Sequence, residues 1–272
     1  MSTHLMFLIP VLLILLDGCS SGLKLTSDWQ QGEMNIDGGD SEWQRGLYYD
    51  NESDMVYGVR NDNNFVYVFL KTQNRSTQMQ IMRQGLTVWF DREDGKNHVF
   101  GIQYPMSRQE THAGFIPDSS EEKLHTFLDQ AFPELEIIGP TKEDIQRFST
   151  LEAPGIRVKL GRTHETLVYE LLVPLKKTSK QPFAIEPISG HRIGIEFETG
   201  EFKSEHMKDG MNVGGRDRVE GLGEGNPTEE GSPGGGGRHH GGRNQGGRGG
   251  TMEKTKQMEL WLSVQLAKST SQ

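Results

Sequence analysis

Tryptophans are the side chains of this sequence best suited to hold a ligand, because an aromatic face packs well against the apolar face of a sugar ring. Our candidate ligand-binding residues are Trp29, Trp43 and Trp89. Trp29 lies close to the predicted start of the domain and could be exposed. Trp89 lies between two apolar residues of a predicted strand, where alternation turns part of the run outward but does not show which part. We expect the fourth, Trp261, to cap the core on the last predicted strand.

Acidic residues gather in two short segments that could bind calcium through oxygen ligands. They are Asp37, Asp40 and Glu42 in the first segment and Asp91, Glu93 and Asp94 in the second. Neither segment has the fixed spacing of a calcium loop, and polar turns explain both equally well. His239 and His240 are adjacent but lie in a glycine-rich stretch, where they would form only a weak, promiscuous site. We therefore predict no metal site and no bound cofactor.

No enzyme motif is present: the sequence has no G-x-S-x-G elbow, no H-E-x-x-H and no P-loop. A glycosidase needs two carboxylates that face each other across a cleft, and 38 acidic residues could hold such a pair without any motif to mark it. The 11 methionines and 9 histidines single out no axial pair for haem. We predict a protein without catalytic residues.

Cys19, the only cysteine, follows an apolar run of twelve residues, Leu5 to Leu16. The run is too short to cross a bilayer, which takes about 20 residues, but has the length of a signal-peptide core. The segment from Leu16 to Cys19 resembles the lipobox of bacterial lipoproteins, although Asp17 departs from it. This predicts a signal peptide over residues 1–18, lipid on Cys19 and a tether over residues 19–32. The alternative is a free thiol beside an ordinary cleavage site.

Charge and composition limit the partners. The net charge is −9, and nucleic-acid binders usually present a basic face, so we predict no nucleic acid. A single cysteine excludes an internal disulfide and clustered-cysteine metal sites. Residues 206–250 hold 17 of the 34 glycines and almost no large apolar side chains. We therefore predict that residues 206–255 form a long disordered loop inserted before the last strand.

The remaining sequence predicts a mainly β fold, an antiparallel β-sandwich of jelly-roll or immunoglobulin-like type. Three hairpins are expected, pairing 55–60 with 65–72, 86–91 with 98–104, and 156–160 with 166–173. Two further strands are expected over 192–198 and 258–267, and residues 65–70 are apolar on both faces, as in a central strand. A helix should begin at the capping box Ser119-x-x-Glu122 and end before Pro133, and a shorter one should cover 141–148. The predicted domain comprises residues 33–205 and 256–268.

Four segments in order resemble the carbohydrate-binding module family 9-like and DOMON-like β-sandwiches. They are Asn35–Trp43 ("IDG…W"), Asn61–Val68 ("D-x-x-N-L-Y-V"), Tyr169–Pro174 ("Y-E-x-x-I-P") and Gly194–Phe197. The resemblance implies the fold and leaves the ligand open, since such domains bind sugars, bind haem or have no known ligand. It also implies that Trp43 packs in the core, and that sugar binding would use a pair of facing aromatics.

Together these observations favour a non-catalytic, lipid-anchored, extracytoplasmic lipoprotein whose domain binds a ligand, and a glycan is the ligand we expect. The resemblance to lipoproteins implies the outer membrane. An acidic residue after the lipidated cysteine can retain a lipoprotein in the inner membrane, but positions 20 and 21 are Ser20 and Ser21. The rival is a structural or adaptor lipoprotein that docks envelope proteins, and a haem-binding redox domain is a third class. A glycan binder should show two exposed aromatics on one face, and an adaptor should show an apolar patch.

Overall fold

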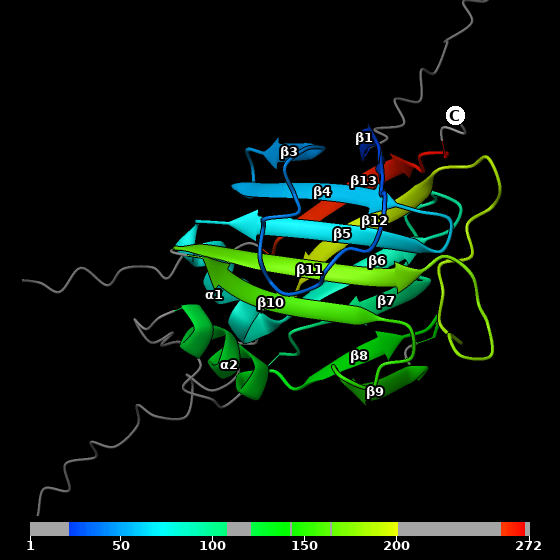
Figure 1. The fold of residues 1–272 in the computed structure, drawn as a ribbon. Coiled ribbons are helices and arrows are strands. Elements are labelled where there is room, and N and C mark those ends of the chain that lie inside the picture. The colour runs from blue at the N-terminus through cyan, green and yellow to red at the C-terminus, as the bar shows by residue number, and fades with distance from the viewer. Residues whose placement is uncertain (1–21, 108–120, 142, 164, 201–256, 270–272) are drawn as a thin grey trace, which may run out of the picture. The chain divides into compact units, whose positions relative to one another are not determined.

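The computed structural model describes residues 22–107, 121–141, 143–163, 165–200 and 257–269. The predicted signal peptide, Cys19, the glycine-rich insertion and its His239 and His240 lie outside the described residues. Within them the chain forms two packed sheets and two helices (Figure 1). No helix of the described part is long and apolar enough to cross a membrane.

One sheet has seven strands in the order β1-β13-β12-β6-β7-β8-β9. Its strands are β1 (Leu23–Thr26), β13 (Glu259–Gln265), β12 (Ile193–Thr199), β6 (Leu86–Asp91), β7 (Phe100–Gln103), β8 (Glu134–Ile138) and β9 (Ile145–Ser149). Neighbours are antiparallel except β1, which runs parallel to β13.

The second sheet has six strands, with the order β10-β11-β5-β4-β2 and β3 paired to β4. Its strands are β10 (Arg157–Thr163), β11 (Thr166–Pro174), β5 (Phe65–Thr72), β4 (Met55–Asn61), β2 (Asp28–Trp29) and β3 (Leu47–Asp50). The predicted hairpins are confirmed as β4–β5, β6–β7 and β10–β11. The predicted central strand is β5, between β11 and β4.

Both sheets contribute to one hydrophobic core. Val88 and Phe197 of the seven-stranded sheet lie in the same buried cluster as Leu70 and Tyr169 of the six-stranded sheet. The longer strands supply every second residue to this cluster, as the alternation of a pleated strand requires; these are β4, β5, β6, β10, β11, β12 and β13. The predicted β-sandwich is therefore confirmed.

The N-terminal segment is part of the sandwich, which corrects the predicted boundary. Residues 23–29, expected within a tether, form β1 beside β13 and β2 beside β4. Between the two strands, the hydroxyl of Ser27 bonds to Asn61 Oδ1 at 2.5 Å, and the backbone N–H of Ala267 donates to both side chains at 2.9 Å. This buried polar group joins the N-terminal segment to the ends of β4 and β13.

One predicted helix is confirmed and the other is wrong. Helix α2 (Glu121–Ala131) ends before Pro133 as expected, while the Ser119 of its predicted capping box lies outside the described residues. Residues 145–148 of the expected helix over 141–148 instead lie in β9, whose five residues pair with β8. Helix α1 (Arg75–Gln84) was not predicted, and Asn74 caps it by accepting from the N–H groups of Ser76 and Thr77.

The outer face of the six-stranded sheet is covered by the chain's own N-terminal residues. Met34 and Trp43 pack on Tyr67, Phe69 and Leu172 in a second buried cluster. Most of this covering layer is the "IDG…W" segment, Asn35–Trp43.

Candidate ligand-binding sites

Two half-buried tryptophans point away from the core on the seven-stranded sheet. Val88 and Phe90 are buried in the core, so Trp89 between them projects to the opposite face. Trp261 projects to that same face, because Leu260 and Leu262 are buried in the core. Trp261 was expected to cap the core and instead lies outside it. The alternation of its neighbours in the sequence was the signal that could have placed it.

Register brings these two rings into one row across the strands. Glu196 of β12 is the partner of Trp89 on one side and of Trp261 on the other. The two tryptophans are thus two strand spacings apart, about 9.5 Å between their Cα atoms. We call Trp89, His98, Glu196, Glu198 and Trp261 the outer-sheet site.

Glycines beneath the rings let both indoles lean over the sheet. A methyl group built on Gly101 would come within 2.6 Å of Cε3 of Trp89. One built on Gly194 would come within 2.4 Å of Cζ2 of Trp261. Any larger residue at either position would displace the ring, so a glycine on the neighbouring strand shapes the surface at each tryptophan.

Contacts with neighbouring side chains hold the ring of Trp89 and leave the ring of Trp261 open. The indole N–H of Trp89 donates to Glu198 Oε2 at 2.6 Å, and the ring of His98 stacks on Trp89 with centroids 4.5 Å apart and planes 7° apart. His98 Nε2 lies 2.6 Å from Glu196 Oε2. Within the described part of the chain, the indole N–H of Trp261 has no hydrogen-bond partner. Trp261 therefore offers a stacking surface and a spare donor.

Burial raises the pKa of Glu196, and the hydrogen bond and charge of His98 oppose that shift. Glu196 and Glu198 lie two residues apart on the same face of one strand. Glycosidases place their two carboxylates on opposite walls around the scissile bond. On this surface both carboxylates take part in hydrogen bonds, Glu198 with the indole of Trp89 and Glu196 with His98.

The other two tryptophans lie elsewhere. Trp43 is buried, donates from its indole N–H to Glu170 Oε1 at 2.8 Å and stacks on Phe69 at 4.7 Å, so it serves the core. Trp29 is half-buried in β2 of the other sheet. The structure therefore does not bring the three candidate tryptophans together, and it pairs Trp89 with Trp261 instead.

The acidic segments are used in turns and ion pairs. Asp37 accepts from the N–H of Gly39 at 2.8 Å, and Asp40 pairs with Lys71 at 2.8 Å. Asp91 accepts from the N–H groups of Glu93 and Asn97, which closes the turn between β6 and β7. Among the described residues, no group of three or more histidine, cysteine, aspartate and glutamate side chains could hold a metal ion.

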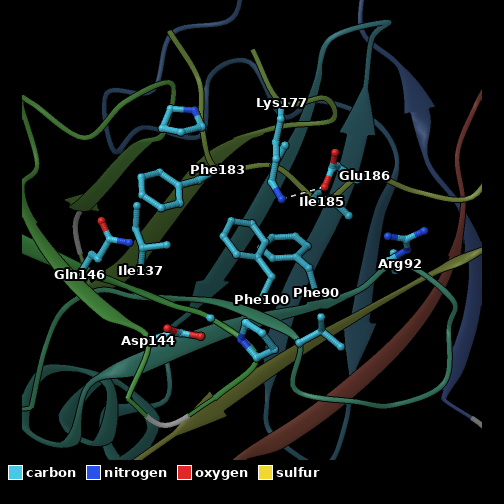
Figure 2. A pocket seen from close by; sticks show the side chains of 15 residues that line it. Phe90, Arg92, Phe100, Ile137, Asp144, Gln146, Lys177, Phe183, Ile185 and Glu186 are labelled. Carbon is cyan, nitrogen blue, oxygen red and sulfur yellow. Dashed lines mark ion pairs between the residues drawn. The ribbon is translucent and has the colours of Figure 1, made fainter. Parts of the chain in front are cut away.

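A pocket of about 370 Å³ lies at one end of the sandwich (Figure 2). It is lined by the ends of β6 to β9 and by the segment that follows β11. Its apolar lining includes Phe90, Phe100, Ile137, Phe183 and Ile185. Its charged lining residues are Arg92, Asp144, Lys177 and Glu186. We call it the end pocket.

Comparison with known proteins gives only distant similarity. No protein-family model matches the sequence, and no curated protein matches it. A solved carbohydrate binding module family 9 from Caldicellulosiruptor kristjanssonii, in complex with glucose, is 14% identical with a TM-score of 0.32, over 66% of this chain and 80% of that chain. A structure of the same description in complex with cellotriose is 14% identical with a TM-score of 0.31, over 65% and 75%.

Proposed function

We propose that this protein is a non-catalytic glycan-binding protein and that the outer-sheet site holds the glycan. The observation that carries the proposal is the row of Trp89, Glu196 and Trp261, in which a carboxylate lies between the open ring of Trp261 and the ring of Trp89 stacked under His98. Sugars present an apolar ring face to aromatics and hydroxyl groups to acceptors, and this row supplies both partners.

Trp261 provides the primary stacking surface in this proposal, since its ring is not covered by another aromatic of the described residues. Sugar hydroxyls donate to Glu196 and to the exposed Glu259, which precedes Trp261 by two residues on the same face. At the other end of the row, the exposed imidazole of His98 lies over Trp89 and forms the surface there. A span of two strands suits an oligosaccharide rather than a single sugar.

The test is a glycan-array screen of the folded protein, followed by calorimetric titration with the best glycan. Trp261→Ala removes the stacking surface and is expected to weaken binding at least about tenfold, the equivalent of about 1.4 kcal/mol. Glu196→Gln is expected to weaken it less. Trp29→Ala is the matched control, because Trp29 lies in the other sheet, and should bind like the wild type.

Either of two results would contradict the proposal: the folded protein binds no glycan, or Trp29→Ala and Trp261→Ala weaken glycan binding equally. The visible absorption spectrum of the same preparation tests the haem alternative.

If the protein were an adaptor, its surface should carry one apolar patch. The exposed large hydrophobic residues of the described part come from several separate segments: Leu23, Tyr48, Tyr49, Ile145 and Leu151.

The proposed setting is the cell envelope, with lipid on Cys19 as the anchor to the outer membrane. Its support is the sequence around Cys19, which resembles a lipobox. Metabolic labelling with a fatty-acid analogue, followed by membrane fractionation, tests it. Cys19→Ser should abolish labelling and move the protein to the soluble fraction, and unchanged membrane association of that variant would contradict the anchor.

A further inference from the structure

We propose that the end pocket is a second binding site, separate from the glycan site, and that it takes a small organic anion with an apolar ring, such as an aromatic carboxylate. The two sites lie on opposite faces of the β6–β7 hairpin. Trp89 faces outward to the outer-sheet site, whereas its neighbour Phe90 faces inward and lines the end pocket. One bound molecule therefore has no need to touch both.

The pocket wall is held in place by the backbone. After β11 the chain turns back on itself, and the N–H groups of Ile185 and Glu186 donate to the carbonyls of Pro174 and Leu175, both at 3.0 Å. Glu186 has a φ of 53°, a left-handed conformation that costs free energy in a residue other than glycine. These contacts hold it there, so the chain's own backbone fixes this wall.

The inner lining sets the chemistry of the buried end of a ligand. Phe90 and Phe100 lie 5.9 Å apart between ring centroids, and Phe183 faces them from the opposite wall (Figure 2). Ile137 and Ile185 also belong to the apolar lining. A sugar pushed against this surface would leave hydroxyl groups without partners, which is costly. A volume of about 370 Å³ lies in the range of small-molecule sites, so an apolar ring suits it.

The charged rim sets the chemistry of the exposed end. Lys177 is already paired with Glu186 at 2.8 Å. Asp144 lies on the opposite side of the pocket from Arg92 (Figure 2). Arg92 has only its neighbour Glu93 as an ion-pair partner among the described residues, at a loose 3.8 Å. A guanidinium group binds a carboxylate with two parallel hydrogen bonds, so an anionic head group fits beside Arg92.

The experiment is a calorimetric titration of the full chain with 3-phenylpropionate. A second titration uses 3-phenylpropanamide, its neutral counterpart. The acid should bind saturably at one site, and the amide should bind about tenfold more weakly because it lacks the charge. Arg92→Gln should reduce the acid to the affinity of the amide and leave the amide unchanged. Phe183→Ala should weaken both ligands, since it removes part of the apolar lining.

Two controls separate this site from others. Arg147→Gln removes a cation of β9 that pairs with Glu136 away from the pocket, and it should leave both affinities unchanged. Trp261→Ala tests the glycan site alone and should also leave them unchanged. The proposal is overturned if the folded wild type shows no saturable binding, if acid and amide bind equally, or if Arg147→Gln acts like Arg92→Gln.

Discussion

At the scale of single residues, the decisive group for the fold is the carboxylate of Glu170. It is fully buried and accepts hydrogen bonds from the indole N–H of Trp43 and from the backbone N–H groups of Asp37 and Gly38, at 2.8 to 2.9 Å. These contacts fasten the covering segment to β11. Burial nevertheless outweighs them and raises the pKa of Glu170 to about 7 from its ordinary value of 4.5.

This shift makes stability depend on pH in a defined direction. Between pH 4.5 and about 7 the folded protein keeps a proton on Glu170 that the unfolded chain releases. The group therefore stabilises the fold most fully at acidic pH, and its contribution falls as pH rises, by at most about 1.4 kcal/mol per pH unit. Urea unfolding of wild type and Glu170→Gln at pH 5, 6, 7 and 8 measures this effect.

The glutamine variant should be less stable than the wild type at pH 5, because an amide cannot accept from all three donors and a buried N–H left unpaired costs about 1–3 kcal/mol. The difference between the two proteins should narrow as pH rises towards 8. A difference that stays constant or widens would show that Glu170 does not carry the proton.

Residue types alone identified tryptophans as the ligand candidates but could not rank them. Trp43 is buried and donates a hydrogen bond to Glu170. The two residues are 127 positions apart, so no local sequence pattern predicts this contact. The resemblance to known sandwiches did predict its burial. Trp261 was the opposite case: its outward position follows from local alternation, but its pairing with Trp89 depends on β12 lying between their strands.

At the scale of elements, the three hairpins could be predicted from the sequence, whereas strand β9 and helix α1 could not. Each hairpin has a turn between two apolar runs, so its evidence is local. Residues 145–148 have apolar positions three apart, which fits a helix. Pairing of all five β9 residues with β8 overrides that spacing. Helix α1 contains mostly polar residues, so only its Asn74 cap marked it.

The glycine beside each outward tryptophan gives a prediction for the outer-sheet site. Gly194→Val places side-chain atoms where Cζ2 of Trp261 lies, and should lift the ring from β12. The expected result is a glycan affinity at least about tenfold lower, similar to Trp261→Ala. Circular dichroism should show a folded β protein, because valine favours strands. Wild-type affinity in a folded Gly194→Val variant would show that the position of the ring does not matter.

At the scale of the whole molecule, the start of the domain lies beside the proposed glycan site. Gly22 is close to Trp261, since a methyl group built on it would come within 2.3 Å of Cδ1 of that ring. Cys19 is only three residues earlier, a reach of at most about 11 Å for an extended chain. Sequence reasoning expected a tether of 14 residues and could not see that β1 and β2 shorten it, because their partners β13 and β4 are distant in the chain.

A lipid on Cys19 would therefore hold the outer-sheet site close to the membrane surface. We predict that the lipidated protein in vesicles binds a long soluble glycan more weakly than the Cys19→Ser protein does, because the bilayer obstructs one end of the row. Insertion of twelve Gly and Ser residues between Ser21 and Gly22 should restore the affinity of the lipidated protein, since a flexible linker of that length spans about 20 Å. Flotation of vesicles with labelled glycan measures the binding. Equal affinity with and without the inserted linker would place the site away from the membrane, and the glycan would then have free access from the aqueous side.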